Sequence, residues 1–280
     1  MARRQQATAR QERLGAELRK LREAAGLKAR EAAALLGTDS AQMSQIESGF
    51  AGVSEERVRR LAAHYSCTDQ DLVEALVTMT TDRTHGWWEE YRGLLPTSFL
   101  DLSELEHYAT YRWDVDFLHV PGLLQTVDYA RALFSRRVPE LPGNELELRV
   151  EHRMRRRAVI EKVPYEALVH EAALRIRVGG RAGSRAQLAQ ILELSEADHV
   201  TVRVIPFDLE DFADLGSAMV YAGGAVPKLD TVVRDAPHGT VFIDSEAQLT
   251  VFRTLFRRVE AVSLEPEKSR DLIHRLTKEL

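Results

Sequence analysis

Histidine and glutamate are the first residues to test for catalysis, because the chain has nine histidines and a His-Glu pair at residues 170 and 171. His170 and Glu171 begin an H-E-x-x-H pattern, in which two histidines one helical turn apart hold zinc. Leu174 stands where the second histidine is needed. The chain also lacks the G-x-x-x-x-G-K-[ST], G-x-G-x-x-G and G-x-S-x-G motifs. The sequence therefore predicts no catalytic residue, no metal site and no cofactor, and a protein that is not an enzyme.

A second group with chemical potential is a run of five arginines and one glutamate between residues 149 and 157. Arginine binds carboxylates and phosphates through paired hydrogen bonds, which suits an acidic protein, a phosphorylated ligand or the flanks of DNA. The candidate residues are Arg149, Arg153, Arg155, Arg156 and Arg157. The alternative is a solvated helix face, neutralised by Glu145, Glu147 and Glu161. Glu171 and Arg175 either line a ligand pocket or form an i,i+4 salt bridge, and we favour the salt bridge.

Basic charge is concentrated at the amino terminus, although the net charge of the chain is −5. Residues 1–30 hold nine Lys and Arg against three Glu, which gives this stretch a net charge of +6. Residues 31–80 hold three basic and eight acidic groups. A basic amino-terminal face can approach phosphates while the acidic remainder keeps the protein soluble.

Cysteine content and hydropathy indicate a cytoplasmic protein. The one cysteine, Cys67, cannot form an intrachain disulfide, which is consistent with a reducing compartment. The amino terminus is polar and has no apolar signal segment. No stretch approaches the ~18 consecutive apolar residues of a membrane helix, so we expect no contact with a membrane.

The first 80 residues predict an all-helical domain of five short helices, because apolar residues recur at intervals of three and four between frequent stops. Glycines end the first three helices at Gly26, Gly37 and Gly49. Asp39, followed three residues later by Gln42, has the form of a capping box that starts the third helix. Starts at Ser54 and Asp69 define the fourth and fifth helices.

The stretch LGAELRKLREAAGLKAREAAALLGTDSAQMSQIESG resembles the helix-turn-helix of the XRE, or lambda-repressor-like, transcriptional regulators. In such folds the second helix of the motif enters the major groove of double-stranded DNA. The resemblance places that helix between Asp39 and Ser48, with Met43 and Ile46 facing the core. It leaves five side chains for DNA, which are Ser40, Ala41, Gln42, Ser44 and Gln45. It also implies a structural ion pair between Arg22 and Glu47.

The sequence departs from the family pattern at two positions. Ala29 stands where the family usually has a phosphate-contacting glutamine, and Phe50 where it often has a basic residue. Both changes remove contacts to the DNA backbone. Compensating cations are available from Lys28, Arg30 and the amino-terminal arm with Arg3, Arg4 and Arg10. The alternative is a helical protein-binding domain with a solvated basic first helix.

Residues 81–110 predict an aromatic helical connector, in which Trp87, Trp88 and Tyr91 either anchor one domain onto the other or belong to the second core. In residues 111–280, helical segments alternate with β-branched runs. We expect a strand at Asp114–Val120, a long charged helix from Asn144 to Glu161, and a meander of three strands near the end. The predicted fold is thus α+β and multidomain, with a mixed α/β domain whose sheet is flanked by helices.

This second region resembles the DUF5753 domain, through VPGLLQTVDYARALF, EHRMRRRAVI, HEAALRIRVGG, VRVIP and LEPEKSRDLI. That domain commonly follows an XRE motif in actinomycete regulators, including WhiJ-like ones. The resemblance implies a dimeric, sequence-specific transcriptional regulator whose carboxy-terminal domain mediates dimerisation and senses a partner or small-molecule effector. The alternative is an antitoxin-like interaction protein that binds a small DUF397-type partner, since the neighbouring gene often encodes one in this family.

Overall fold

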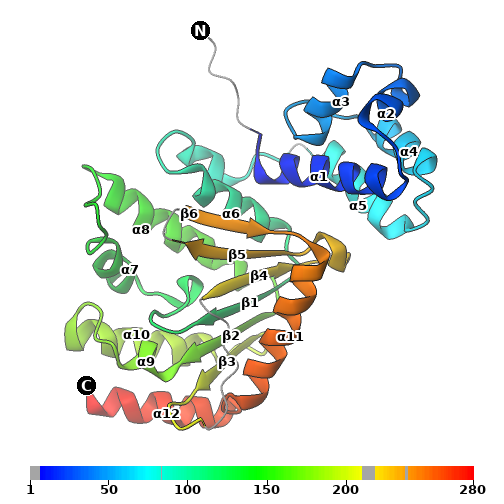
Figure 1. The fold of residues 1–280 in the computed structure, drawn as a ribbon. Helices are drawn as coiled ribbons and strands as arrows, with labels where there is room; N and C mark the ends of the chain where they lie inside the picture. The colour runs from blue at the N-terminus through cyan, green and yellow to red at the C-terminus, as the bar shows by residue number, and fades with distance from the viewer. Residues whose placement is uncertain (1–6, 83, 210–217, 237–238) are drawn as a thin grey trace. The chain divides into compact units, whose positions relative to one another are not determined.

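The computed structural model describes residues 7–82, 84–209, 218–236 and 239–280, and the chain divides into two compact units, Met1–Glu89 and Glu90–Leu280 (Figure 1). The boundary falls inside the predicted connector, residues 81–110. The predicted fold class is confirmed, because the first unit is helical where it is described and the second holds a mixed sheet flanked by helices. Arg3 and Arg4 of the predicted arm lie outside the described residues.

The first unit contains the five predicted helices, α1 Ala9–Ala24, α2 Ala29–Leu36, α3 Ser40–Glu47, α4 Glu55–His64 and α5 Gln70–Thr81. A 3-10 helix, η1 Trp87–Tyr91, follows at the boundary. The side chains of Thr8, Asp39, Ser54 and Asp69 each accept a hydrogen bond from the amide three residues later, which starts four of these helices. Their apolar faces bury Leu18, Met43, Leu61 and Leu76.

The second unit alternates helices and strands. Its helices are α6 Thr97–Tyr108, α7 Val127–Phe134, α8 Glu145–Arg156, α9 Glu171–Arg175, α10 Gly180–Leu194, α11 Glu246–Val262 and α12 Pro266–Glu279. Its strands are β1 Tyr111–Asp116, β2 Tyr165–His170, β3 Val200–Ile205, β4 Met219–Gly223, β5 Thr231–Ala236 and β6 Gly239–Ile243. Short 3-10 helices are η2 Gly122–Leu124, η3 Arg157–Val159 and η4 Pro227–Leu229. None of the described helices is long and apolar enough to cross a membrane.

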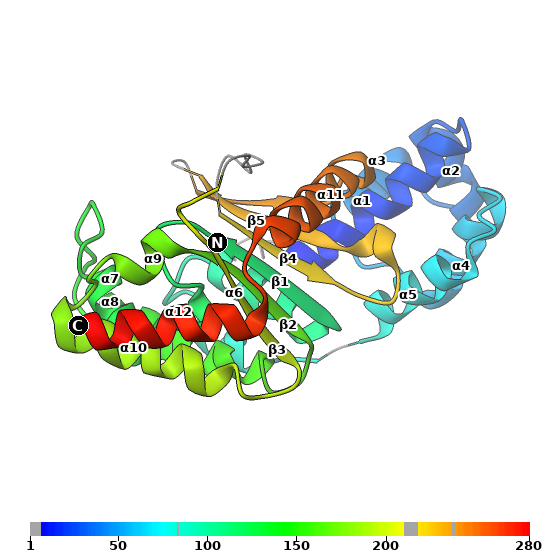
Figure 2. The same cartoon turned by 90° about the horizontal axis from the view of Figure 1, so that it is seen from below.

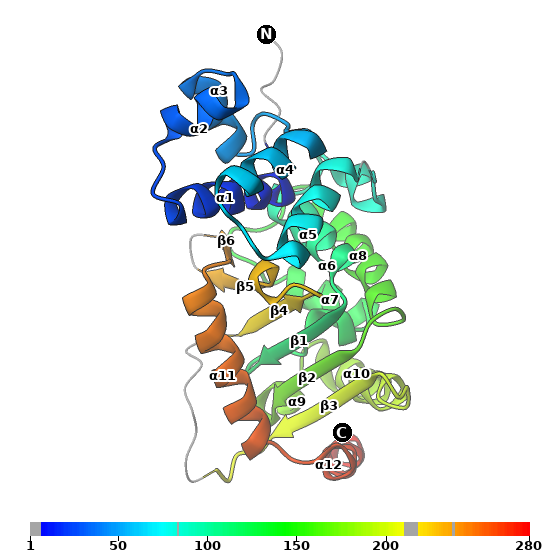
Figure 3. The ribbon, with the colours of Figure 1, turned by 90° about the vertical axis from the view of Figure 1, so that its right-hand side faces the viewer.

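The six strands form one sheet in the order β3-β2-β1-β4-β5-β6. Strands β1, β2 and β3 are parallel neighbours, whereas β4, β5 and β6 continue the sheet as the predicted antiparallel meander. Helix α11 covers one face, and α7, α8 and α10 lie on the other (Figure 3). Helix α12 runs beside α10 and packs on β3 (Figure 2). Each face has its own apolar core, around Phe256 on the α11 side and around Leu188 on the other.

The central strand β1 differs from the prediction at both ends. It begins at Tyr111 and ends at Asp116, where the carboxylate accepts a hydrogen bond from the His119 amide at 3.4 Å and the chain turns. The start of the strand could not be predicted from the hydropathy pattern, because the alternate residues that face inward, Arg112 and Asp114, are charged yet buried. The predicted helix 144–161 is likewise shorter, since α8 ends at Arg156 and continues only as η3.

Candidate nucleic-acid interface

The turn between α2 and α3 is built from local backbone chemistry. Gly37 ends α2 in the left-handed region, at φ +65°, where a residue without Cβ is least strained. Two residues later, the Asp39 side chain accepts a hydrogen bond from the Gln42 amide at 2.7 Å and starts α3. The short stop and immediate restart produce a helix-turn-helix, as the sequence predicts.

Helix α3 has one buried face and one exposed face. Met43 and Ile46 are buried in the core of the first unit, as predicted. On the opposite face, Ser40, Ala41, Ser44 and Gln45 are exposed, and Gln42 is half-buried. Hydroxyl and amide groups on an exposed helix can donate to and accept from base edges in the major groove. The five predicted reading residues thus lie together on one short helix, with Gln42 nearest the core.

Arg22 and Glu47 form the predicted ion pair and join α1 to the end of α3. The guanidinium donates from Nε and Nη2 to the two carboxylate oxygens at 2.6 and 2.9 Å, and from Nη1 to the Leu27 carbonyl at 2.7 Å. Both side chains are only 8% exposed. Burial beside Glu47 also raises the pKa of Tyr65 to about 12. A paired, buried guanidinium of this kind fixes the orientation of the reading helix.

Gly15 is a structural residue of this interface that sequence reasoning missed. A Cβ at Gly15 would lie 2.6 Å from the carbonyl oxygens of Ile46 and Glu47, so α1 can approach the end of α3 only without a side chain here. The available signal was an isolated glycine inside an otherwise regular helical pattern. Gly49 has a similar role, since a Cβ there would lie 2.7 Å from the backbone of Gln11.

Further cations of the helix-turn-helix region come from α2 and α4. Lys28 and Arg30 are exposed at the start of α2, as the DNA hypothesis requires. Arg60, which the sequence analysis did not select, donates from its guanidinium to the Leu35 carbonyl near the end of α2. It therefore places a third positive charge close to the turn that precedes α3. Phe50 is 62% exposed, and no cation replaces it at that position.

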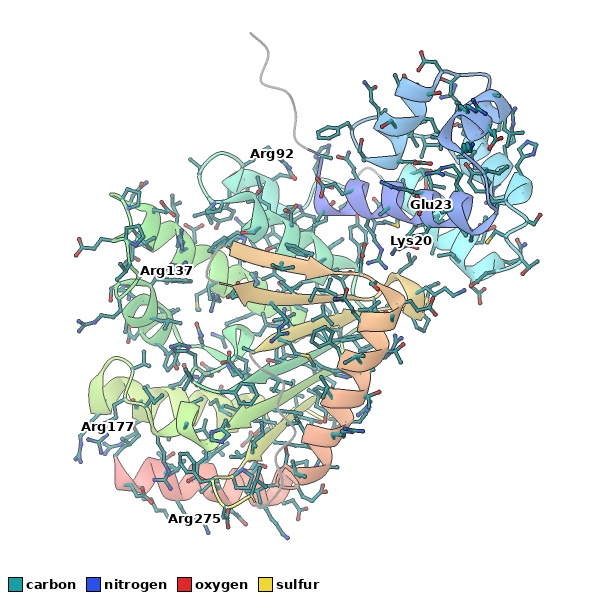
Figure 4. All side chains as sticks on the ribbon, in the orientation of Figure 1. Lys20, Glu23, Arg92, Arg137, Arg177 and Arg275 are labelled. Atoms are coloured by element: carbon teal, nitrogen blue, oxygen red, sulfur yellow. The ribbon has the colours of Figure 1, made fainter. Side chains whose placement is uncertain are left out.

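The basic first helix carries less free positive charge than its sequence suggests. Arg13 and Lys20 both pair with Glu17, at 2.8 and 2.7 Å, and Arg19 pairs with Glu23 at 2.8 Å. Lys20 and Glu23 are labelled on α1 in Figure 4. Pairs within one helix offset most of its charge, so the attraction for phosphates depends more on the exposed residues of α2.

The arginine run in α8 does not form the exposed surface that was predicted as a partner site. Arg149 and Arg156 are buried and pair with Glu145 and Glu106, at 2.5 and 2.6 Å. The solvated-face alternative fails for these two residues as well. The reason is tertiary, because α8 lies on a sheet and beside α6, both of which carry charged groups.

The other three arginines of the run are half-buried. Arg155 pairs with Glu90 at 2.5 Å, and Arg153 donates to Gln125 at 2.7 Å. Arg157 lines a cavity of about 650 Å³ together with Arg155. Exposed arginines that the sequence analysis passed over lie elsewhere in this unit, at Arg137, Arg177 and Arg275 (Figure 4).

The incomplete zinc motif has a structural role at the end of β2. His170 accepts a hydrogen bond through Nδ1 from the Ala172 amide at 3.1 Å and so starts α9. Glu171 pairs with Arg175 at 2.7 Å, which confirms the i,i+4 salt bridge, and its other oxygen accepts from the Phe207 amide at 3.2 Å. These contacts tie the end of β2 to the end of β3.

Family models account for both units. A model described as a helix-turn-helix domain matches residues 13–76, which includes α2, α3 and the pair between Arg22 and Glu47. A second model, described as a domain of unknown function (DUF5753), matches residues 99–275 and thus more than half of the chain. The chain belongs to the DUF5753 family. Comparison with curated proteins and with solved structures gave no match.

The helix-turn-helix match confirms the predicted architecture and supports a DNA-binding regulator. In the DUF5753 region, the match covers the whole sheet and helices α7 to α11, and so includes the buried arginines of α8. The XRE assignment, the actinomycete and WhiJ-like context, the dimer and the DUF397-type partner stay predictions.

Proposed function

We propose that this DUF5753 protein is a cytoplasmic, sequence-specific DNA-binding transcriptional regulator and not an enzyme. Its second unit is proposed to hold two copies together and to sense a partner or a small-molecule ligand. The observation that carries the proposal is the two-faced helix α3. Met43 and Ile46 are buried and Arg22 holds the carboxy-terminal Glu47. The polar side chains of Ser40, Ser44 and Gln45 are exposed.

Dimerisation would give this reading helix its affinity. Helix α3 offers few side chains to bases, and the exposed cations on α2 and its amino-terminal cap are only Lys28 and Arg30. A single short helix with so few contacts binds weakly, whereas two linked readers on two half-sites gain affinity through effective concentration. We therefore expect an operator with two related half-sites, spaced by about one or two helical turns of DNA.

The first experiment selects genomic fragments with the purified full chain and then compares variants on the selected site. Gln45→Ala should weaken binding to that site by about 1–3 kcal/mol, because an amide that reads adenine loses both hydrogen bonds. Binding to random DNA should barely change, since base contacts do not contribute to it. Gln70→Ala is the matched control, because Gln70 is an exposed glutamine at the start of α5, outside the turn and helix that read DNA.

Three outcomes would count against this proposal. Equal loss on selected and random DNA would remove the base-reading role of Gln45. Selection of no fragment, together with co-purification of a small DUF397-type protein, would favour the antitoxin-like alternative. A full chain that sediments as a monomer, and loses less than ~10-fold in affinity when one half-site is scrambled, would contradict the dimer.

A further inference from the structure

Within the described part of the chain, one arginine of helix α8, Arg153, lacks the carboxylate partner that neighbouring arginines have. Arg149, Arg155 and Arg156 each pair with a carboxylate. Arg153 lies between them along the helix and forms no ion pair with any carboxylate of the described residues. A half-buried guanidinium without a counter-charge is costly, because it has left water and gained no opposite charge in return. Arg153 is therefore a candidate to bind an additional anion.

The charges around Arg153 do not supply that anion. Beneath α8, Glu106 pairs with Arg156 and with Arg112, and Arg112 also pairs with Asp114 at 2.8 Å. These four buried groups sum to zero and leave Arg153 without a buried counter-charge among the residues described. Asp235 on β5 also interacts electrostatically with Arg153, but its side chain is exposed, accepts a hydrogen bond from Thr240 at 2.9 Å and forms no ion pair with Arg153. Burial and the neighbouring Arg156 lower the pKa of Arg153 to about 9, which still leaves it protonated at neutral pH.

A second carboxyl group that interacts electrostatically with Arg153, Asp116 at the end of β1, is a weak counter-charge. Burial raises the pKa of Asp116 to about 7, so this carboxyl group is only partly ionised at neutral pH. Burial, and next the charge of Arg153, lower the pKa of His119 and favour its neutral form. Both groups are half-exposed and interact electrostatically with Arg153. An incoming anion would therefore meet a cation beside a neutral histidine and a carboxyl group that is only partly ionised.

The guanidinium is held in place by neutral groups that leave part of it unsatisfied. Gln125 accepts from Nη1 at 2.7 Å, and its own amide donates to the Val120 carbonyl at 2.7 Å. The ring of Phe134 lies 5.0 Å from the guanidinium carbon. The backbone at Gly122 also lies close to the guanidinium, since a Cβ there would be 2.9 Å from Nη1. The Nε atom is buried and has no hydrogen-bond partner among the described residues.

The position in the fold also fits a ligand site. Strand β1 is the strand from which the chain builds the sheet in both directions, through β2 and β3 on one side and β4 to β6 on the other. Asp116, His119 and Gln125 all belong to the segment at and beyond its carboxyl end. In open α/β sheets, ligands bind outside the carboxyl ends of the strands where the strand order reverses.

We propose that Arg153, positioned by Gln125 and bordered by Asp116, His119 and Phe134, binds the carboxylate or phosphate group of a small-molecule ligand. The anion would accept hydrogen bonds from the guanidinium and neutralise its charge. The further statement that this ligand controls DNA binding rests on the proposed regulatory function. Binding of the anion at Arg153 does not depend on that function.

The test is calorimetric titration of the full chain with inorganic phosphate and, separately, with malonate, at constant ionic strength. At least one of the two anions should bind saturably, and the preferred one shows which group the site accepts. Arg153→Gln should weaken that binding by at least ~10-fold, because charge-assisted hydrogen bonds are lost. Arg155→Gln is the matched control, since Arg155 lies on the same helix and already pairs with Glu90. It should bind within about two-fold of the wild type, since a screened surface pair contributes little.

Thermal melting separates loss of binding from loss of folding. The ligand-free Arg153→Gln chain should melt no lower than the wild type, because an uncompensated charge has been removed. The bound anion should raise the melting temperature of the wild type and leave that of Arg153→Gln unchanged. Should Arg153→Gln fail to fold, Arg153→Lys keeps the charge and replaces it in the comparison, with the same expected loss of affinity because the planar fork is gone.

Saturable binding by neither anion, or equal binding by the wild type and the Arg153 variant, would overturn the site. Binding to the selected operator is measured on the same samples without anion. Failure to bind DNA while the anion still binds would contradict the regulatory proposal alone. Failure to bind the anion while DNA still binds would contradict this site alone.

Discussion

The two units use buried arginine in opposite ways. In the first unit, one buried guanidinium, Arg22, holds one buried carboxylate, Glu47, and most of the polar side chains proposed to meet DNA are exposed. In the second unit, charged groups from α6, β1 and α8 meet inside the domain, where Glu106 contacts both Arg112 and Arg156. Helix α1 of the first unit therefore exposes Arg19 and Lys20 to solvent, whereas α8 of the second unit contributes Arg156 to an internal layer of charged groups. Whether a basic side chain is buried depends on the groups of the fold that lie opposite it.

The comparison also separates local from non-local contacts. Arg22 and Glu47 are 25 residues apart in the sequence and belong to one compact motif. Glu106 and Arg156 are 50 residues apart and come from α6 and α8, which precede and follow β1 along the chain. Removing a partner from a buried pair leaves an uncompensated charge, which costs more than the pair contributes. The internal layer of the second unit should therefore be the most sensitive part of the molecule.

The largest expected effect follows from Glu106→Gln. This change keeps the shape of the side chain but leaves Arg112 and Arg156 with the single carboxylate of Asp114. We expect a loss of about 3–5 kcal/mol in the free energy of unfolding, the cost of breaking a buried ion pair. Urea unfolding of the full chain, followed by the fluorescence of Trp113 and the other tryptophans, measures this loss.

The matched control for that change is Glu90→Gln, which removes an exposed carboxylate from Arg155 on the same helix. It should leave the unfolding midpoint unchanged, because solvent screens an exposed pair. Similar midpoints for Glu106→Gln and Glu90→Gln would mean that the layer under α8 is hydrated, and the contrast between the two units would disappear.

A smaller effect is expected in the first unit from Glu47→Ala. The change leaves Arg22 buried with only the Leu27 carbonyl as a strong acceptor, so we expect a loss of about 2 kcal/mol. Hydrogen exchange of the amides in α1 and α3 reports this unit separately from the other. Glu55→Ala is the control, since Glu55 belongs to the same unit, is exposed and pairs with Arg59 instead of Arg22. Equal exchange rates in both variants would contradict the structural role of the pair.

The same contrast decides how much the sequence could predict. The five amino-terminal helices, Arg22 with Glu47, and the two buried residues of α3 follow from spacing and capping within short windows, and the structure confirms them. In the second unit the long charged helix and the three-strand meander were predictable, but the short helix α9 and the environment of α8 were not. Charge patterning suggested an exposed surface, because nothing near residues 149–157 in the sequence indicates that Glu106 and Gln125 lie opposite. Contacts between distant segments decide burial, and a single sequence does not encode them locally.

A third prediction concerns pH and tests Asp116. Its pKa is about 7 in the folded chain and 3.8 when the group is free, so the folded state holds an extra proton between these values. Stability from this group therefore falls as pH rises from about 4 to 7. Asp116→Asn stays neutral, and its stability relative to the wild type should grow over this window to about 2 kcal/mol, the full linkage being reduced by partial solvent contact. Melting temperatures at pH 5 and pH 8 measure it. An identical pH dependence of the melting temperature in both chains would show that the Asp116 carboxyl group is fully solvated and keeps its ordinary pKa in the folded state.

The smallest effect is expected from Glu74→Gln on the outside of the first unit. Glu74 accepts two hydrogen bonds from Arg59, at 2.5 and 2.9 Å, and Arg59 also pairs with Glu55 at 2.9 Å. The geometry is as good as that between Arg22 and Glu47, but all three side chains are more than 40% exposed. Because water and salt screen exposed charges, and Glu55 keeps Arg59 paired, the melting temperature should not change at physiological ionic strength. A clearly lower melting temperature would show that an exposed bidentate pair stabilises the contact between α4 and α5. Burial would then not explain why ion pairs contribute differently in the two units.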